Sequence, residues 1–409
     1  MSITNLRFGV VKEYLMICGQ GVDSPFICLI YKVIGKINKI FYEGLRPCLS
    51  ITDPQFIRSD STTPKDPLHT SLFFSKYPEW KRIRAILSPS FTTGKLKSFQ
   101  PMFRNSLNNL IDKLKDEFKH NEITDLRPIY DSFAFDVISK SAFGLNTNIM
   151  DNPDNPIFMA AKSFFQTGLT QQTIADYIKQ VIKARIDSNF EAKDLLQLSI
   201  NASVFSPKVT SNSFEKLTEE EVLAQSINLM AAGYDTTSTQ LCFITRFLAL
   251  NPDFQTQLVD EMNDSFGGKT DVDYESLMKM SYLDAFLKEI MRINCSVNRI
   301  DRIATNDCVI DGIFLPKGTS IIIPIWALHL DADNYDEPDV FKPQRFLAEN
   351  SSNIKDYTYL PFASGPRNCI GKRFAEMEIK YFLELDFYKL IQTSTMKQLM
   401  VKVKPRNSQ

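Results

Sequence analysis

The sequence predicts a mainly α-helical fold with small β-sheets. The first observation is a helical pattern that follows Thr218-Glu-Glu-Glu221, a reciprocal capping box, and continues to Leu250. The second is the alternating stretch at 307–325, which carries the turns Asp311-Gly312 and Lys317-Gly318 and is typical of short strands. The third is that helical patterns occupy most of the remaining chain. At 1.5 Å per residue the long helix should measure roughly 50 Å, enough to cross a whole domain.

The composition indicates a folded globular protein. The 409 residues are 44% hydrophobic and 23% charged, and a chain of this length can bury a large core. Lys plus Arg (47) balance Asp plus Glu (48), so no overall field directs the chain to nucleic acid or to an anionic membrane. The 7 Cys are scattered without a C-x-x-C pair, which argues against a disulfide framework or a clustered zinc site and favours a reducing compartment.

No linker, low-complexity tract or repeat divides the chain, so we expect one domain over residues 1–409. The N-terminal apolar runs at Phe8–Ile17 and Pro25–Ile34 contain charged residues, and each is shorter than the roughly 18 apolar residues that span a bilayer. The basic start and clean apolar core of a signal peptide are also missing. As written, the chain is expected to have no membrane anchor.

The other elements are expected in the following order. Strand patterns at Ile40–Tyr42 and Pro47–Ile51 flank Gly44 as a short hairpin, and Asp53-Pro54 is typical of a helix start. Helical patterns follow at 77–118, with breaks near Pro89 and Gly94, at Asp125 to about Phe143, capped by Gly144, in a shorter stretch after the loop at 147–156, and from Lys372 to about Leu390.

The middle of the long helix combines small and polar residues. Ala231–Gly233 remove bulk at consecutive positions, and Asp235 and Thr236 follow. Small residues and Thr hydroxyls that bond back to the preceding turn are found where helices pack closely. The same pattern also suits a gap in the helix wall, where a small ligand could receive protons from an acid and an alcohol. Both interpretations stay open on these residues alone.

The most specific local signal is Phe362-Ala-Ser-Gly-Pro-Arg-Asn-Cys-Ile-Gly371, with the spacing F-x-x-G-x-R-x-C-x-G. Its glycines allow the backbone to come close to a flat or bulky group, and a helical pattern starts directly afterwards. A thiol at a helix N-terminus, with Arg367 two residues away from Cys369, is biased toward the thiolate form. The alternative is a buried Cys in an ordinary turn, but five matched positions arise by chance in about one window per three million.

These motifs resemble those of the cytochrome P450 haem-thiolate monooxygenases. The matching segments are the Cys loop at 362–371, Ala232-Gly-Tyr-Asp-Thr-Thr237, Glu289-Ile-Met-Arg292, Phe341-Lys-Pro-Gln-Arg-Phe346 and Trp80-Lys-Arg-Ile-Arg84. The E-x-x-R pattern alone has little weight, because Glu43–Arg46 and Glu79–Arg82 also satisfy it. The order of the segments carries the resemblance, which runs from about Gly35 to Lys380 and is most similar to the animal microsomal branch that oxidises drugs and steroids, of family 3 type.

The resemblance implies a haem b cofactor (iron protoporphyrin IX) whose metal is bound by Cys369. It implies catalytic acid and alcohol roles for Asp235 and Thr236, with space for dioxygen at Gly233. It also implies haem contacts from Trp80, Arg84, Arg302, Phe362, Arg367 and Gly371, and a structural ion cluster of Glu289, Arg292 and Arg345.

The implied activity is insertion of one oxygen atom from O₂ into a lipophilic small molecule, such as a steroid, a fatty acid or a xenobiotic. We find no flavin or nicotinamide motif, so the electrons of NADPH would arrive through NADPH–cytochrome P450 reductase, with cytochrome b5 as a further candidate partner. The residues Lys81, Arg82, Lys372 and Arg373 could form a basic docking patch; the alternative is a solvated helix face. The resemblance implies the cytosolic face of the endoplasmic reticulum membrane, and a chain that is complete as written would be cytoplasmic.

The chain also departs from the microsomal pattern. The loop at 58–80 that helps to roof the pocket and the terminal hairpin after Tyr381 are expected to be shorter. Between Phe165 and Ile182, most of the two lid helices and the segment that connects them are expected to be missing. From the sequence as written, no hydrophobic anchor is expected, and the Pro usually found beyond E-x-x-R is replaced around Asn294-Cys295. Two other functions therefore stay open. One is a haem-binding member that is oxidatively inactive or incomplete, and the other is a helical scaffold that no longer holds haem.

Overall fold

The computed structural model describes residues 39–43, 46–50, 70–120, 124–167, 171–188, 192, 194–203, 216–267, 272–310 and 313–385. These residues divide into two compact units. The helical unit consists of residues 70–238 and 370–385, and the sheet unit consists of the strands at 39–50 together with residues 239–369. The expectation of a single domain stays a prediction.

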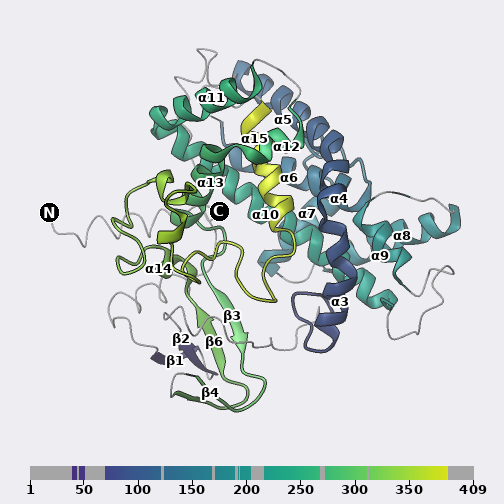
Figure 1. Ribbon diagram of the computed structural model, residues 1–409. Helices are drawn as coiled ribbons and strands as arrows, with labels where there is room; N and C mark the ends of the chain where they lie inside the picture. The colour runs from purple at the N-terminus through teal and green to yellow at the C-terminus, as the bar shows by residue number, and fades with distance from the viewer. Residues whose placement is uncertain are drawn as a thin grey trace. The chain divides into compact units, whose positions relative to one another are not determined.

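The helical unit is built mainly from α-helices (Figure 1). Its elements are α3 (Glu79–Leu87), the 3₁₀ turn η2 (Ser88–Phe91), α4 (Thr93–Ser98), α5 (Gln100–His120), α6 (Leu126–Phe143), α7 (Pro156–Thr167), α8 (Gln171–Ser188), α9 (Leu195–Asn201), the first part of α10 (Glu219–Leu250) and α15 (Lys372–Leu385). Helix α6 is buried along almost its whole length and contacts α5 and α9, so it forms the centre of this unit.

Local signals set the helix boundaries where the sequence predicts them. Helix α10 begins with the expected capping box, in which the N–H of Glu221 donates to Thr218 Oγ1 (3.1 Å) and the N–H of Thr218 donates to Glu221 Oε2 (2.9 Å). Helix α6 begins at Asp125, whose carboxylate accepts from the N–H of Arg127, and ends at Gly144 with a φ of 59°. Side chains or left-handed backbone thereby satisfy polar groups that helix ends leave free.

Aromatic side chains join α15 to the core of the helical unit. The rings of Phe374 and Phe103 lie 5.2 Å apart, and those of Phe382 and Tyr130 meet edge to face at 5.4 Å. Each such ring contributes about 1.5–3 kcal/mol by leaving water. Helix α15, which follows Cys369 closely in the sequence, is therefore firmly held in its own unit.

The sheet unit contains a mixed four-stranded sheet and a separate hairpin (Figure 1). Its elements are β1 (Lys39–Glu43), β2 (Arg46–Ser50), the last part of α10, α11 (Pro252–Phe266), α12 (Tyr274–Lys279), α13 (Ser281–Ile293), β3 (Ile300–Ile303), β4 (Cys308–Ile310), β5 (Ile313–Leu315), β6 (Ser320–Ile323), α14 (Ile325–His329), and the 3₁₀ turns η4 (Pro343–Phe346) and η5 (Ser351–Asn353).

The prediction of one small sheet at 307–325 is wrong in its pairing. Strands β4 and β5 pair only with each other in the described residues, whereas β6 lies in the order β1-β2-β6-β3, parallel to β2 and antiparallel to β3. The reason is the composition of β6, whose Ile321, Ile322 and Ile323 are all buried. A strand that is apolar on both faces is favoured in the middle of a sheet.

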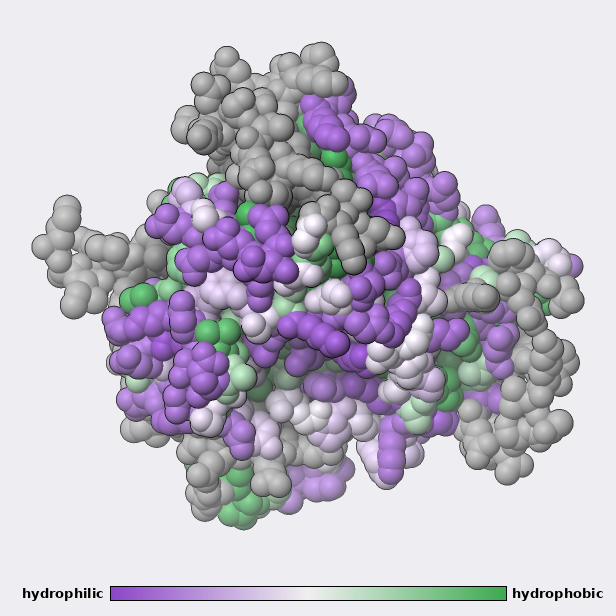
Figure 2. Space-filling model, turned by 45° about the horizontal axis from the view of Figure 1, so that its top comes forward, coloured by the Kyte–Doolittle hydropathy of each residue, from purple (hydrophilic) through white to green (hydrophobic). Residues whose placement is uncertain are grey.

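Several predicted features lie outside the described residues: the N-terminal apolar runs, the turns at Gly44 and Asp311-Gly312, the helix start at Asp53-Pro54 and the chain after 385. Among the helices that the structure does describe, none combines the length and the apolar character needed to cross a bilayer. On the face drawn in Figure 2, hydrophilic residues cover most of the coloured surface and hydrophobic residues form small separate groups.

Candidate active site

The Cys loop is a tight turn closed by its own backbone. The N–H of Cys369 donates to the carbonyl oxygen of Phe362 (2.9 Å), and the N–H of Asn368 donates to that of Gly365 (3.1 Å). Gly365 has a φ of 78°, and Ala363 has a φ of 59°. These left-handed conformations turn the chain back on itself. Cys369 takes no part in a disulfide and is an exposed residue, so a ligand can reach it.

In the middle of α10, the small residues lie where this helix packs closely against another helix, as one of the two interpretations predicts. A Cβ added at Gly233 would lie 2.8 Å from Cγ1 of Ile138 on α6, which is too close for a real contact. A larger residue at position 233 would therefore displace the side chain of Ile138. The hydroxyl of Thr236 donates to the carbonyl oxygen of Ala232 (2.8 Å), the expected bond to the preceding turn. The interpretation as a ligand gap stays a prediction beside this one.

Asp235 is held by a basic partner from a different helix. Nη2 of Arg127, at the start of α6, lies 2.7 Å from Asp235 Oδ1, and the Nε of Arg127 donates to Asp131 (2.8 Å). The hydroxyl of Ser238 donates to the same oxygen of Asp131 (2.7 Å). The side chains of Arg127 and Asp235 remain 22% and 25% exposed, so this pair lies where protons can exchange with solvent.

The residues expected to contact the haem propionates lie in both units. Trp80 and Arg84 are half-buried on α3, and Arg367 is half-buried in the Cys loop. Arg302 is half-buried on β3, where its Nη1 donates to the backbone carbonyl of Asp301 (2.9 Å). Phe362 is half-buried, and Gly371 precedes the first residue of α15 and accepts from the N–H of Ala375 (2.9 Å).

The expected ion cluster is assembled within the sheet unit. Arg292 donates from Nε and Nη2 to the two carboxylate oxygens of Glu289, each at 2.8 Å, and both side chains have no exposed surface. Nε of Arg345 lies 3.4 Å from Glu289 Oε1, and the N–H of Lys342 donates to the same oxygen (2.8 Å). Arg292 Nη1 also donates to the carbonyl oxygens of His329 (2.7 Å) and Pro338 (2.9 Å). Glu289 and Arg292 thus tie three segments together.

Sequence reasoning missed two groups next to the candidate catalytic residues. One is Arg127, which no sequence signal connects to Asp235, because 108 positions separate them. The other is Glu378 on α15, whose side chain shares a hydrogen bond with that of Thr237 and whose pKa is raised by burial. Glu378 follows Phe374 by four residues on the buried side of α15. The sequence signal for Glu378 is a single acidic residue within the apolar face of a predicted helix.

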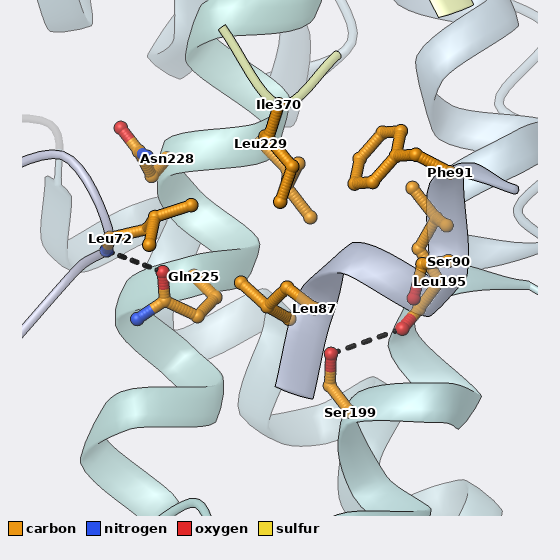
Figure 3. Close-up of a pocket in the computed structure, with 10 residues that line it drawn as sticks. All are labelled: Leu72, Leu87, Ser90, Phe91, Leu195, Ser199, Gln225, Asn228, Leu229 and Ile370. Carbon is orange, nitrogen blue, oxygen red and sulfur yellow. Dashed lines mark hydrogen bonds between the residues drawn. The ribbon is translucent and has the colours of Figure 1, made fainter. Parts of the chain in front are cut away.

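A small cavity lies in the helical unit beside α10 (Figure 3). Its volume of about 30 Å³ holds one or two water molecules, which is far too little for a porphyrin or a lipophilic substrate. Leu87, Phe91 and Leu229 form much of its apolar lining, and Gln225 accepts from the N–H of Leu72 at its edge (2.6 Å). Ile370, the neighbour of Cys369 in the sequence, also lines it.

The donor set fits haem better than a bare metal ion. Among the residues that the structure describes, no group of three or more His, Cys, Asp or Glu side chains is arranged to hold a metal. A porphyrin brings four nitrogen ligands of its own, so a single exposed cysteine such as Cys369 would be enough to complete its attachment. Within the sheet unit, the half-buried residues Arg302 and Arg367 carry guanidinium groups of the kind that bind carboxylates such as propionates.

A family model described as cytochrome P450 matches residues 52–169 and 161–387, which is most of the chain. Curated relatives agree with this match. Cytochrome P450 3A9 of Rattus norvegicus is 34% identical over 396 residues, covering 86% of this chain and 78% of that protein. Cytochrome P450 3A56 of Fundulus heteroclitus is 35% identical, covering 85% and 78%, and cytochrome P450 3A12 of Canis lupus familiaris is 33% identical, covering 89% and 80%.

The alignment with the rat protein also bears on the regions expected to be short. The alignment is 396 positions long, which is more than the number of residues in the covered 86% of this 409-residue chain. Some residues in the aligned part of that relative therefore have no counterpart here. The expectation that three particular regions are short stays a prediction. The structure places the end of α7 and most of α8 at 165–182, so this segment is helical where most of the lid helices were expected to be missing.

Proposed function

Because the chain belongs to the cytochrome P450 family, of family 3 type, we propose that Cys369 is the thiolate that binds the haem iron. Membership in the family makes the protein a haem-dependent monooxygenase of lipophilic small molecules. The single observation that carries the assignment of Cys369 is its loop, where an exposed thiol sits in a turn closed by the bond from its own N–H to Phe362.

We propose that the substrate is a steroid, a fatty acid or a xenobiotic, oxidised at the cytosolic face of the endoplasmic reticulum. When bound, the haem supplies activation of dioxygen and insertion of one oxygen atom into the substrate. Trp80, Arg84, Arg302 and Arg367 would hold its propionates by hydrogen bonds and ion pairs. Phe362 and Gly371 would border it on the side of the thiolate.

Asp235 and Thr236 would handle the protons that oxygen cleavage consumes. The hydroxyl of Thr236 can both accept and donate a hydrogen bond, and Asp235 is partly exposed beside Arg127. A carboxylate between solvent and a hydroxyl can pass protons inward without leaving its place. Arg127 would keep Asp235 oriented between turnovers.

Substitutions at these two residues test both the activity and the roles. With NADPH and a reductase, the wild type should couple NADPH consumption to oxidised product. Thr236→Ala should retain haem and divert about tenfold more reducing equivalents to hydrogen peroxide, because protons are no longer delivered in order. Asp235→Asn should slow NADPH consumption about tenfold, because the amide cannot carry the proton. Product, peroxide and NADPH are measured in the same reaction.

Ser226→Ala is the matched control, because the Ser226 hydroxyl lies on the same helix and bonds back to Val222 (2.8 Å) as that of Thr236 does to Ala232. It should leave coupling unchanged. Normal coupling of NADPH consumption to product in both Thr236→Ala and Asp235→Asn would show that these residues do not transfer protons. Reductant consumption without any product by the wild type would favour a haem-binding but oxidatively inactive member.

Electrons would reach the haem from NADPH–cytochrome P450 reductase, with cytochrome b5 as a second donor. The basic residues expected to dock it differ in their surroundings within the helical unit. Arg82 pairs with Glu221, and Lys372 lies 3.8 Å from Glu376, so neighbouring acids offset both charges. Lys81 is exposed, and exposed Arg373 donates to the neutral hydroxyl of Thr93 (2.6 Å). We therefore place the greater part of the attraction on Lys81 and Arg373.

Charge reversal at these two positions should weaken docking. The double variant Lys81→Glu with Arg373→Glu should slow flavin-to-haem electron transfer by about tenfold at low salt, and this deficit should shrink as salt screens the charges. Haem content should not change. Each reversal changes the net charge by two units, so Lys317→Glu, at an exposed position in the sheet unit, is the control for either single variant, Lys81→Glu or Arg373→Glu. Stopped-flow reduction under carbon monoxide measures the rate, and equal rates at low salt would show that these residues do not dock the reductase.

A further inference from the structure

His329 is the last residue of α14, is fully buried, and uses both ring nitrogens in hydrogen bonds. Nδ1 lies 3.0 Å from the carbonyl oxygen of Arg292, and Nε2 lies 2.8 Å from the backbone nitrogen of Leu360. The ring also stacks on Tyr359, with centroids 5.6 Å apart. One side chain thus joins the end of α13 to the segment that leads into the Cys loop.

The two backbone partners decide where the imidazole carries its proton. A backbone N–H only donates, so Nε2 must accept from Leu360 and Nδ1 must donate to the carbonyl of Arg292. Burial lowers the pKa of His329 to about 3. The ring therefore stays neutral throughout the neutral pH range, and both bonds persist together.

Arg292, whose carbonyl accepts from the His329 ring, is itself held by hydrogen bonds. The guanidinium of Arg292 donates to the carbonyl oxygen of His329 (2.7 Å), while the carbonyl of Arg292 accepts from the His329 ring. The same guanidinium makes its paired bonds to Glu289. The backbone of His329 is therefore bonded directly to the side chain that forms this buried ion pair.

Leu360, whose N–H donates to Nε2 of His329, is the last buried residue before the Cys loop. It is 1% exposed and belongs to a core cluster with Cys295, Ile323 and Leu328. From 361 to 369 every residue is half-buried or exposed. The carbonyl of Leu360 accepts from the N–H of Ala363 (3.0 Å), where the loop begins to turn.

We propose that His329 is a positioning residue that holds the start of the Cys369 loop, and thereby keeps the sulfur within reach of the haem iron. This inference rests on the proposed function, in which Cys369 is the ligand. A loop without buried residues of its own takes its position from the bonds at its ends. The bond from the N–H of Leu360 to His329 is such a bond.

Two substitutions separate the bonds of the ring. The Nδ2 of Asn takes the place of His Nδ1, so His329→Asn can still donate to the Arg292 carbonyl but offers nothing to Leu360. The Oε1 of Gln reaches the place of His Nε2, so His329→Gln can still accept from Leu360 but not donate to Arg292. Each variant loses one buried hydrogen bond, and only Asn releases the loop.

The test is made on the haem-loaded full chain, in its reduced carbon monoxide complex. Mild heating should convert the red-shifted band of the thiolate complex to the band of a complex without thiolate about ten times faster in His329→Asn than in the wild type. His329→Gln should convert within about twofold of the wild-type rate. Urea unfolding of the haem-free chains should give the two variants similar losses of stability, which shows that the difference in ligation does not come from general destabilisation.

Equal conversion rates in the two variants, with equal losses of stability, would mean that His329 is only structural. If His329→Asn does not fold, Tyr359→Leu replaces it, because loss of the stacked ring loosens both bonds; an unchanged rate there would overturn the inference as well. A wild type that never shows the red-shifted band would instead contradict the proposed function, so the two failures can be told apart.

Discussion

Replacing Cys369 with serine is expected to abolish the red-shifted Soret band of the reduced carbon monoxide complex. That band arises when a thiolate donates electron density to the iron opposite carbon monoxide. A serine hydroxyl stays protonated at neutral pH and does not replace this donation. Cys369→His should likewise lose the band, although the imidazole can bind iron. The measurement is the spectrum of the reduced protein with carbon monoxide minus that of the reduced protein without it, with haem content determined in parallel.

Cys308→Ser is the matched control, because Cys308 is a half-buried cysteine on β4 that takes no part in a disulfide and stands outside the loop motif in the sequence. Its spectrum should equal that of the wild type. An unchanged band in Cys369→Ser would mean that another residue binds the iron, and the assignment of the loop would then be wrong.

Removing Arg292 is expected to have the second large effect, on folding. Arg292→Met leaves Glu289 as a buried carboxylate without its main cation and leaves the carbonyls of His329 and Pro338 without a donor. Breaking a buried pair in this way costs about 3–5 kcal/mol. That is a large part of the 5–15 kcal/mol by which folded proteins are typically stable. Urea unfolding of the haem-free chain measures the loss.

The same helix offers the control. Lys288 and Asp284 form an ion pair at 2.7 Å on α13, but their side chains are 36% and 37% exposed. Lys288→Met should therefore cost only about 0.5 kcal/mol, since solvent screens the pair. A loss below about 1 kcal/mol in Arg292→Met would show that the buried cluster does not support the fold as argued.

The sequence predicted best those features that depend on neighbouring residues. The bounds of α10 and the caps of α6 follow from side chains within four positions of the helix ends, so both were predicted correctly. The pairing of β6 with β2 was missed because it joins residues such as Leu49 and Ile321, which local alternation cannot connect.

In the candidate site, too, local features were predicted and long-range contacts were not. The motif around Cys369 is contiguous, so its turn could be expected before the backbone bond to Phe362 was known. Arg127 and His329 could not be assigned, because each acts through a partner at least 31 positions away in the sequence. Packing brings such residues together, and no spacing rule describes the result. Asp235 and Thr236 were selected by resemblance, and their roles stay predictions.

The carboxylate of Glu289 also limits the order in which the chain can be assembled at the ribosome. Glu289 and Arg292 are synthesised together, but the backbone N–H of Lys342 that completes their cluster follows 53 residues later. Two charges cannot leave water cheaply until their remaining hydrogen bonds are available. The nascent chain must therefore keep this end of α13 hydrated while the next segment emerges. Closure of the sheet unit is thus a late event in synthesis, and chains that stop before residue 342 should be captured by chaperones as unfinished proteins.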